Sequence, residues 1–272
     1  MRSLLYVPAD SQRFVSKAHQ RGADAIILDL EDSVSEDAKD DARLGLADAV
    51  TMVRRGGASV MVRINSGERQ REDADAACRA GADTLYVPKV RSAEELGVLA
   101  SVLEGVETSA GRAPMRFIAL IEDPAAVLNA SAIAAAPRLI GLSLGGEDLA
   151  LALGAQPTPD VLHLPKLLVH YAAKAAGLLS FGLLRSVADY SDLVGITRAA
   201  REARAHGFDG ATCVHPAVVP LLNAAFAPSA EEQAWAKRVL ERAAAREGSF
   251  QLDGKMIDAP IIARARAVMS RT

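Results

Sequence analysis

Short apolar runs alternate with longer, helix-like segments along most of the chain, and this alternation limits the possible folds more than any other feature. Most of the runs are nearly continuous in apolar residues, as in parallel strands that are covered on both faces. The pattern predicts eight strands, at Ser3–Ala9, Ala25–Leu30, Ser59–Asn65, Thr84–Val90, Arg116–Glu122, Leu139–Gly145, Gly177–Leu184 and Gly210–Pro216.

The intervening segments are Ala-rich and charged, and several carry apolar residues at three- and four-residue spacing, which is typical of helices. We expect helices at Asp37–Arg55, Gln70–Ala80, Ser92–Leu103 and Asp192–His206. Glycines that follow helices and precede strands are typical of helix C-terminal caps. They are Gly22, Gly81, Gly177 and Gly207.

Eight β-then-α units predict one (β/α)8 barrel, a TIM barrel, over residues 1–228. The chain has 272 residues, half of them hydrophobic, which is normal for such a domain. An open, doubly wound sheet is the alternative. Against it, no glycine fingerprint follows the first predicted strand, and Tyr6–Asp10 lacks a phosphate-binding loop.

A tail, residues 229–272, is longer than one closing helix requires. It has helix-like patterns at Glu231–Glu247 and Ala259–Ser270, with a polar loop at Gly248–Asp258 between them. We predict a C-terminal helical extension, which either folds over its own barrel or packs on a neighbouring subunit.

Composition restricts the class of partner. Lys plus Arg is 31 and Asp plus Glu is 34, a net charge of -3, which argues against nucleic acid or an anionic membrane. No apolar stretch approaches the roughly 20 residues that span a bilayer, and the N-terminal apolar run is too short for a secretion signal. We expect a cytoplasmic protein in which Cys78 and Cys213 are buried free thiols.

Charged residues end several predicted strands, where barrels of this kind have their active sites. Glu122 and Asp148 are the best pair, because each closely follows an apolar run on neighbouring strands. Carboxylates without soft ligands suit Mg²⁺, with Mn²⁺ as a second possibility. The alternative is that the acids here cap the next helices: Asp123, before Pro124, fits a cap, and Glu147 or Asp148 could cap the helix that follows.

Arg63 ends an otherwise apolar strand, and a charge in that position is seldom buried without a partner. It could bind a carboxylate or stabilise an enolate oxygen. It could equally pair with Glu31, Asp32 or Glu122, and such a pair would pre-position the guanidinium.

Two other strand-end residues have alternative interpretations. Lys89 would suit a Schiff-base aldolase, although that leaves the acidic pair unexplained. His215, before a proline, is interpreted as a hydrogen-bonded structural residue rather than a base.

Eight motifs occur in one order along nearly the whole chain: RSLLYVPADSQRF, GADAIILDLEDSV, VRIN, LYVPKV, LIED, GGEDLA, GFDGATCVHPAVVPLLNAAFAP and LDGKMIDAP. Together they resemble the citrate lyase β-subunit-like group of the HpcH/HpaI aldolase superfamily, which includes malyl-CoA, β-methylmalyl-CoA and citramalyl-CoA lyases. The resemblance implies a (β/α)8 barrel, Mg²⁺, and a homotrimer or dimer of trimers.

The resemblance also assigns roles to residues. Glu122 and Asp148 match the metal ligands, and Arg63 matches the arginine that contacts the thioester carbonyl and the substrate. Four further residues are assigned to the substrate site, of which the first two are acids that reach the metal site through water: Glu31, Asp32, Gly146 and Glu147.

Asp258, in GKMID, matches a catalytic acid that the C-terminal segment lends to an adjacent subunit, with Asp253 as the competing choice. The sequence departs from the family pattern at two positions. Asp123 stands where many members have threonine, and Gly182 stands near where many have an acid after the seventh strand.

The implied activity is a carbon–carbon lyase that cleaves a 2-hydroxy-carboxylate CoA thioester by retro-Claisen chemistry. Citramalyl-CoA is the first expected substrate and malyl-CoA the second. Alternatives are a citrate lyase β subunit acting on a citryl acyl-carrier-protein thioester, a malyl-CoA thioesterase, and a metal-binding or assembly protein that kept the barrel but lost the chemistry.

Overall fold

A computed structural model describes residues 1–245 and 248–270, and the chain divides into two compact units, Met1–Asn223 and Ala224–Thr272. Each unit is described by itself. The division falls within helix α11 (Val219–Phe226), a few residues before the 228/229 domain boundary predicted above, which itself stays a prediction.

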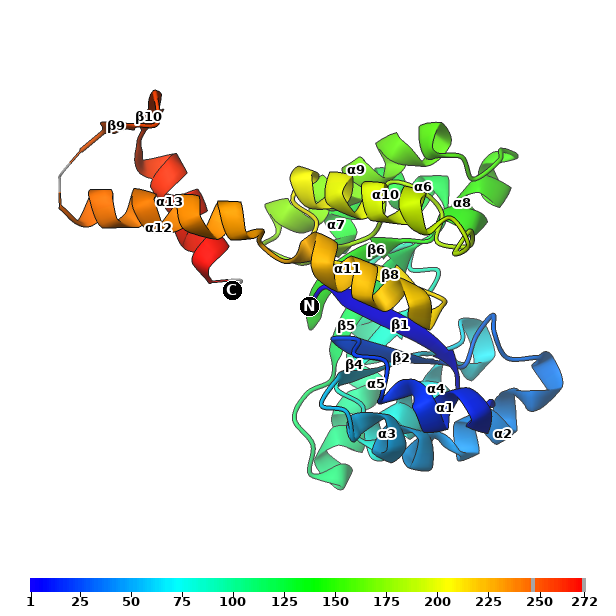
Figure 1. Cartoon of the computed structure of the whole chain (residues 1–272). Coiled ribbons are helices and arrows are strands. Elements are labelled where there is room, and N and C mark those ends of the chain that lie inside the picture. Colours follow the sequence, from blue (N-terminus) through cyan, green and yellow to red (C-terminus); the bar gives the residue numbers. More distant parts are fainter. Residues whose placement is uncertain (246–247, 271–272) are drawn as a thin grey trace. The chain divides into compact units, whose positions relative to one another are not determined.

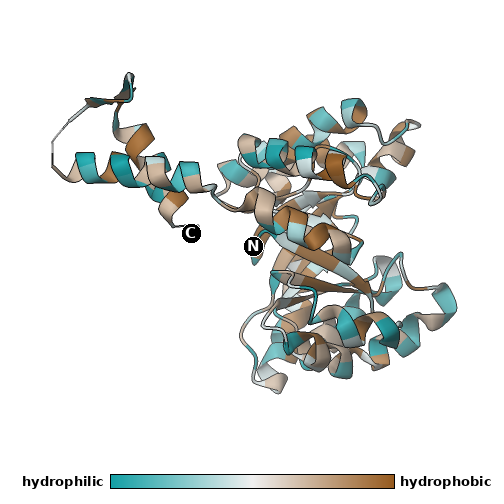
Figure 2. Ribbon diagram, in the orientation of Figure 1, coloured by the Kyte–Doolittle hydropathy of each residue, from teal (hydrophilic) through white to brown (hydrophobic). Residues whose placement is uncertain are grey.

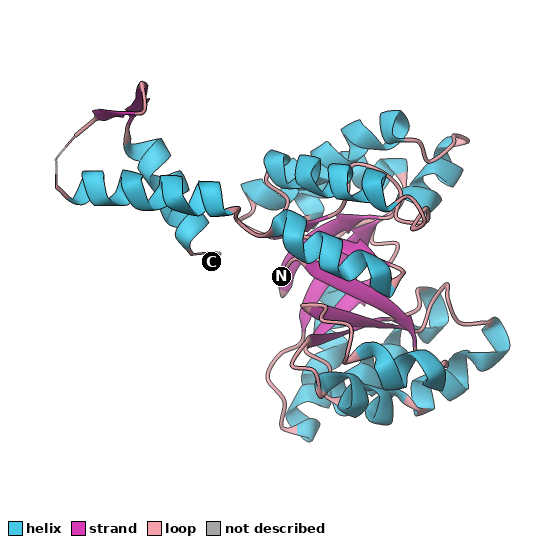
Figure 3. Ribbon diagram, in the orientation of Figure 1, coloured by secondary structure: helices cyan, strands magenta, loops and turns pink. Residues whose placement is uncertain are grey.

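The first unit is a barrel of eight parallel strands surrounded by helices, as predicted (Figures 1 and 3). Neighbouring strands follow the order β7-β6-β5-β4-β3-β2-β1-β8, and a bridge between Phe181 and Gly210 brings the two ends of the sheet together. The strands are β1 (Ser3–Pro8), β2 (Ala25–Asp29), β3 (Ser59–Arg63), β4 (Thr84–Val87), β5 (Arg116–Ile121), β6 (Leu139–Leu144), β7 (Leu179–Phe181) and β8 (Ala211–Cys213).

All eight observed strands lie inside the eight predicted runs, and the predicted runs are longer at their ends. The interior of the barrel is filled by apolar side chains, including Met61, Tyr86 and Phe181, which are almost fully buried. Figure 2 shows the hydrophobic strands inside and more hydrophilic residues on the surrounding helices. Such an interior is a packed core, so ligands are expected at the ends of the strands.

The surrounding helices lie between successive strands. They are α1 (Gln12–Ala18), α2 (Lys39–Leu44), α3 (Leu46–Arg54), α4 (Gln70–Ala80), α5 (Ala93–Ala110), α6 (Pro124–Leu128), α7 (Ala130–Ile133), α8 (Gly146–Leu153), α9 (Pro159–Ala175) and α10 (Leu193–His206), with short 3-10 turns at Glu36–Ala38 and Gly67–Arg69. A third 3-10 turn, Pro216–Val218, follows β8 and precedes α11.

One predicted helix is divided in the structure. The segment Asp37–Arg55 forms a 3-10 turn followed by α2 and α3, which meet at Gly45. Glycine is unfavourable in a helix interior and lets the axis change direction there. By contrast, Gly81 and Gly207 cap α4 and α10 in the left-handed conformation, as predicted.

The second unit has a hydrophobic core of its own. Helices α12 (Ala230–Ala244) and α13 (Ala259–Met269) pack on each other and on Phe250, Leu252 and Ile257. The predicted loop between them contains a hairpin, β9 (Phe250–Leu252) and β10 (Lys255–Ile257). Asp253 and Gly254 both have positive φ, and such an Asp-Gly pair is typical of the tight turn that joins two antiparallel strands.

Other expectations concern single features. The end of the predicted helix Glu231–Glu247 lies outside the described residues. Cys78 and Cys213 are free and buried, as expected. In the described part of the chain, every helix is too short or too polar to cross a membrane.

Candidate functional site

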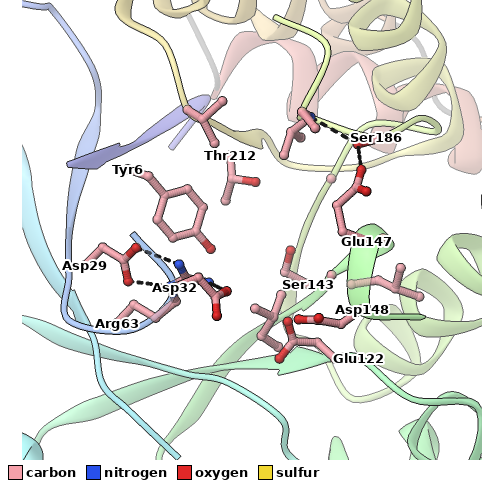
Figure 4. A pocket seen from close by; sticks show the side chains of 18 of the residues that line it. Tyr6, Asp29, Asp32, Arg63, Glu122, Ser143, Glu147, Asp148, Ser186 and Thr212 are labelled. Carbon is pink, nitrogen blue, oxygen red and sulfur yellow. Dashed lines mark hydrogen bonds and ion pairs between the residues drawn. The ribbon is translucent and has the colours of Figure 1, made fainter. Parts of the chain in front are cut away.

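A cavity of about 400 Å³ lies at the carboxyl-terminal ends of the barrel strands (Figure 4). Its walls come from residues that end or follow β1, β2, β3, β5, β6, β7 and β8. Six of the seven residues predicted for the barrel's site line it: Arg63, Asp32, Glu122, Asp148, Gly146 and Glu147. The seventh, Glu31, is buried behind Arg63 and contacts it.

Glu122 and Asp148 lie side by side in this cavity. Glu122 follows β5 and is buried, while Asp148 is in the first turn of α8. Their carboxyl groups point toward one another in Figure 4, and Asp148 is within hydrogen-bonding reach of Glu122. Burial, the Glu31 charge and Asp148 together raise the pKa of Glu122 to about 8. The predicted pair is therefore brought together.

Gly145, at the end of β6, permits this approach. A Cβ atom at this position would lie 2.5 Å from Oε1 of Glu122 and 2.8 Å from its Cγ, so any other residue would displace the carboxylate. The residue's φ of -78° is ordinary, and the requirement for glycine is therefore one of space. In the sequence, Gly145 ends the sixth predicted strand, and only its neighbour Gly146 was assigned to the substrate site.

Neither Glu122 nor Asp148 is the N-cap of a helix, so the helix-cap alternative does not apply to these two acids. Asp123, and not Glu122, caps α6 by accepting from the Ala126 amide at 2.8 Å. The N-cap of α8 is Gly145, which offers no side chain, and Asp148 lies inside the helix.

These two carboxylates fit a divalent cation. They are hard oxygen donors, and Mg²⁺ typically takes one or two carboxylates and completes its octahedral shell with water and substrate oxygens. Burial and the neighbouring Glu31 and Asp148 charges disfavour the charged form of Glu122 and raise its pKa, and a divalent cation would offset that cost. Within the described residues no group of three or more His, Cys, Asp or Glu is arranged as a metal site, so a cation here would keep open positions.

Arg63 is held by three carboxylates. Its Nε and Nη2 donate to the two oxygens of Asp29, both at 2.6 Å, and its Nη1 contacts Asp32 at 2.9 Å and Glu31 at 3.0 Å. The guanidinium also lies over the Tyr6 ring, 4.9 Å from the centroid. Of the three predicted ion-pair partners, Glu31 and Asp32 are found.

Asp29 was not predicted as a site residue, although it binds Arg63 most directly. The two residues are register partners on the adjacent strands β2 and β3, which places their side chains together. Burial opposes ionisation of Asp29, but its hydrogen bonds with Arg63 prevail and lower the pKa of this carboxyl. The result is a fixed, bidentate pair at the cavity wall.

Lys89 pairs with Glu31 rather than acting as a free amine. Its Nζ donates to Glu31 at 2.8 Å, and this bond raises the pKa of Lys89. A protonated amine cannot attack a carbonyl, which argues against the Schiff-base alternative. The left-handed backbone of Lys89, with φ of 54°, directs its amide toward Glu122 at 2.7 Å.

The remaining predicted residues have structural contacts. His215 accepts from the Ala217 amide at 3.2 Å and stacks on Tyr190. In the second unit, Asp258 caps α13 by accepting from the Ile261 amide, and Asp253 pairs with Arg238 at 2.6 Å. These contacts leave the predicted role of Asp258 as a prediction.

Residues 2–216 match the model of the HpcH/HpaI aldolase/citrate lyase family. The chain belongs to this family. It is thus an enzyme of the lyase type, as the resemblance implied. The citrate lyase subunit beta of Escherichia coli (strain K12) is 35% identical over 99% of this chain and 92% of its own length.

Other relatives carry different names. A (3S)-malyl-CoA thioesterase from Cereibacter sphaeroides is 34% identical over 99% of this chain and 94% of its own length. Among solved structures, protein CitE from Mycobacterium tuberculosis, in complex with magnesium, acetoacetate and coenzyme A, has a TM-score of 0.82 and 32% identity over 99% of this chain and 97% of that one. Another solved structure, a citrate lyase beta subunit from the same organism, holds oxaloacetate and magnesium; it has a TM-score of 0.70 and 32% identity over 83% of this chain and 96% of its own.

Proposed function

We propose that this protein is a Mg²⁺-dependent lyase that cleaves a 2-hydroxy-carboxylate thioester of CoA into acetyl-CoA and a 2-oxo acid. The observation that carries the proposal is the Glu122–Asp148 pair, which shares one cavity with the Arg63 guanidinium. The magnesium and CoA complexes of the M. tuberculosis relatives support it.

Glu122 and Asp148 would hold the cation and leave positions for the carboxylate and hydroxyl oxygens of the substrate. Bound there, Mg²⁺ would make the hydroxyl easier to deprotonate. The hydroxyl proton passes to water, the resulting alkoxide becomes the new carbonyl as the carbon–carbon bond breaks, and the electron pair of that bond passes to the thioester as an enolate. The enolate carbon then takes a proton, which gives acetyl-CoA.

Arg63 would stabilise the enolate oxygen. Its bidentate partner Asp29 is buried, whereas the Asp32 side chain is 55% exposed. Because Asp32 is the solvated partner, a substrate oxygen can replace it on Nη1 at little cost. Asp29 would meanwhile keep the guanidinium in place, which is pre-organisation of an electrostatic group. Asp258, lent by a neighbouring subunit, would supply the proton.

For the acyl group of the substrate, we propose two candidates. Citramalyl-CoA, which would give pyruvate, is the first candidate, and malyl-CoA, which would give glyoxylate, is the second. A citryl thioester on an acyl carrier protein and thioesterase action on malyl-CoA are the alternatives, and the names of the relatives support both. We propose that the protein forms a homotrimer or a dimer of trimers, and light scattering of the purified protein would test this oligomeric state. We also propose that it lies in the cytoplasm.

The deciding experiment measures 2-oxo acid released from a panel of 2-hydroxyacyl thioesters by the purified protein, with Mg²⁺ and with EDTA. We expect turnover with Mg²⁺ and its loss in chelator. Full activity in EDTA would remove the metal from the mechanism. Free malate without a 2-oxo acid would instead indicate the thioesterase.

Asp148→Asn tests the metal site directly, because it removes one anionic ligand and keeps the side-chain shape. We expect Mg²⁺ affinity, measured by calorimetry, to fall by about tenfold or more. Asp160→Asn is the matched control, since Asp160 occupies the first turn of α9 and lies outside the cavity lining. Unchanged Mg²⁺ binding by Asp148→Asn would contradict the assignment.

A further inference from the structure

Lys166 is a buried cation in the cavity wall. It lies on α9, and the whole residue is only 4% exposed. Its Nζ donates to the backbone carbonyl of Arg185 at 2.9 Å, in the segment that follows β7. An ammonium has three N–H donors, so this bond leaves two for another partner.

A buried lysine normally has an anionic partner. Lys174, on the same helix, has one in Asp209. Lys166 has no carboxylate within 4.0 Å among the described residues. The charge that acts on its ammonium from farther away is Glu147, whose carboxylate accepts a hydrogen bond from the Ser186 hydroxyl. Burial accordingly lowers the pKa of Lys166 to about 8.

The two cations among the described residues that line the cavity thus differ in what they can offer a ligand. Arg63 is bound by Asp29, Glu31 and Asp32, whereas Lys166 is bound by a neutral carbonyl. The other charged lining residues are acids, so most of the cavity repels an anion. A negatively charged group that enters would be favoured at the metal and at Lys166.

We propose that Lys166 is a specificity-determining residue that binds a second carboxylate on the 2-oxo acid part of the substrate, beyond the carboxylate next to the scissile bond. This inference rests on the proposed function and refines it. It changes the order of acyl groups proposed above, because a second carboxylate subsite favours citryl-type thioesters, whose 2-oxo fragment is dicarboxylic, over citramalyl-CoA, whose fragment has one carboxylate.

The competing explanation is that Lys166 only anchors the segment after β7 through Arg185. That role would affect monocarboxylic and dicarboxylic ligands equally. A carboxylate subsite would affect only the dicarboxylic ligand, because the buried charge is left without a partner when that ligand's second carboxylate is missing. A pair of ligands that differ in this group separates the two roles.

The test is calorimetric binding of freshly prepared oxaloacetate and of pyruvate to the full-length protein in Mg²⁺. We expect the wild type to bind oxaloacetate about 10- to 100-fold more tightly than pyruvate. Lys166→Met should abolish this preference and leave pyruvate affinity within about threefold of wild type, since Met keeps the length of the side chain. Lys166→Arg should retain part of the preference.

Lys174→Met is the matched control, and its preference should equal that of the wild type. The inference is overturned if the wild type shows no preference or binds neither acid, or if Lys166→Met weakens both acids alike. Turnover is scored separately. If the protein prefers oxaloacetate but cleaves no thioester, the Lys166 subsite is supported and the proposed lyase function is contradicted.

Discussion

At the scale of single residues, charge in the cavity is distributed unevenly. Arg63 contacts three carboxylates, whereas burial and the Glu31 and Asp148 charges raise the pKa of Glu122, and Lys166 has no carboxylate within 4.0 Å among the described residues. A buried charge without a partner costs free energy, and a ligand of opposite charge removes that cost. These two positions are where we propose that a divalent cation and a carboxylate bind.

Asp29→Asn tests the buried ion pair between Asp29 and Arg63. The change leaves the Arg63 charge buried without its bidentate partner, and removing one member of a buried pair typically costs about 3–5 kcal/mol. We expect a loss of this order in the free energy of unfolding, measured in urea. Asp40→Asn removes an exposed partner of Arg43 and should stay close to wild type. Equal stability of the two variants would show that the Asp29 pair contributes little.

Lys166 also predicts a pH dependence. Only its ammonium form binds a carboxylate, and with a pKa of about 8 that form is lost as the pH rises. The wild-type affinity for oxaloacetate, relative to pyruvate, should fall on the order of tenfold between about pH 7 and pH 9.5. The charged group that acts on Lys166 is Glu147; the nearby Arg185 contacts Lys166 through its backbone carbonyl, and its guanidinium pairs with Asp189 and Asp192.

Pyruvate serves as the reference in this experiment because titration of Glu122 alters Mg²⁺ binding for both ligands. In Lys166→Arg the guanidinium stays charged throughout, and the ratio of the two affinities should no longer depend on pH. A ratio that falls equally in this variant would assign the titration to another group.

At the scale of elements, the cavity is formed mainly by residues at the carboxyl ends of the barrel strands. All eight strands and the Glu122–Asp148 pair were predictable, because continuous apolar runs mark buried parallel strands and barrels gather their carboxyl ends on one face. The Asp29–Arg63 pair was not, because it depends on the register of β2 and β3. Lys166 was not either, since nothing local distinguishes it from Lys174 on the same helix.

Gly145→Ala tests the contact between the end of β6 and Glu122. The added methyl would overlap Oε1, so the carboxylate must move. We expect Mg²⁺ affinity to fall by about tenfold or more, since metal sites depend on ligand position to within about 0.5 Å. Calorimetry measures this, and unchanged affinity would mean that Glu122 binds the metal in another position or not at all.

Gly97→Ala is the matched control. Gly97 lies within α5, and a Cβ there meets no other atom within 4 Å. Alanine should therefore stabilise the protein by about 0.5–1 kcal/mol and leave Mg²⁺ binding unchanged.

At the scale of the whole molecule, the chain comprises two units, each with its own core. The helices of the second unit were predictable from their apolar spacing. Its hairpin was not, because the Asp253-Gly254 turn lies in a short, polar segment that reads as a loop. Asp258 caps α13. A test of its proposed catalytic role therefore needs a substitution that preserves this cap.

Asp258→Asn is that change, because asparagine caps helices as well as aspartate does but cannot donate the required proton. We expect this variant to fold normally and lose thioester cleavage, while Asp253→Asn, which alters the pair with Arg238, stays active. The reverse result would assign the acid to Asp253.

Complementation then asks which subunit supplies the acid. Glu122→Gln and Asp258→Asn should each be inactive alone. If the C-terminal unit of one subunit completes the barrel of the next, co-expressed oligomers contain some sites with an intact barrel and an intact acid. With equal, random mixing, these amount to about one quarter of all sites in a closed ring. Recovered cleavage of that order supports exchange between subunits, whereas a mixture as inactive as its parents would place Asp258 at its own barrel or outside the reaction.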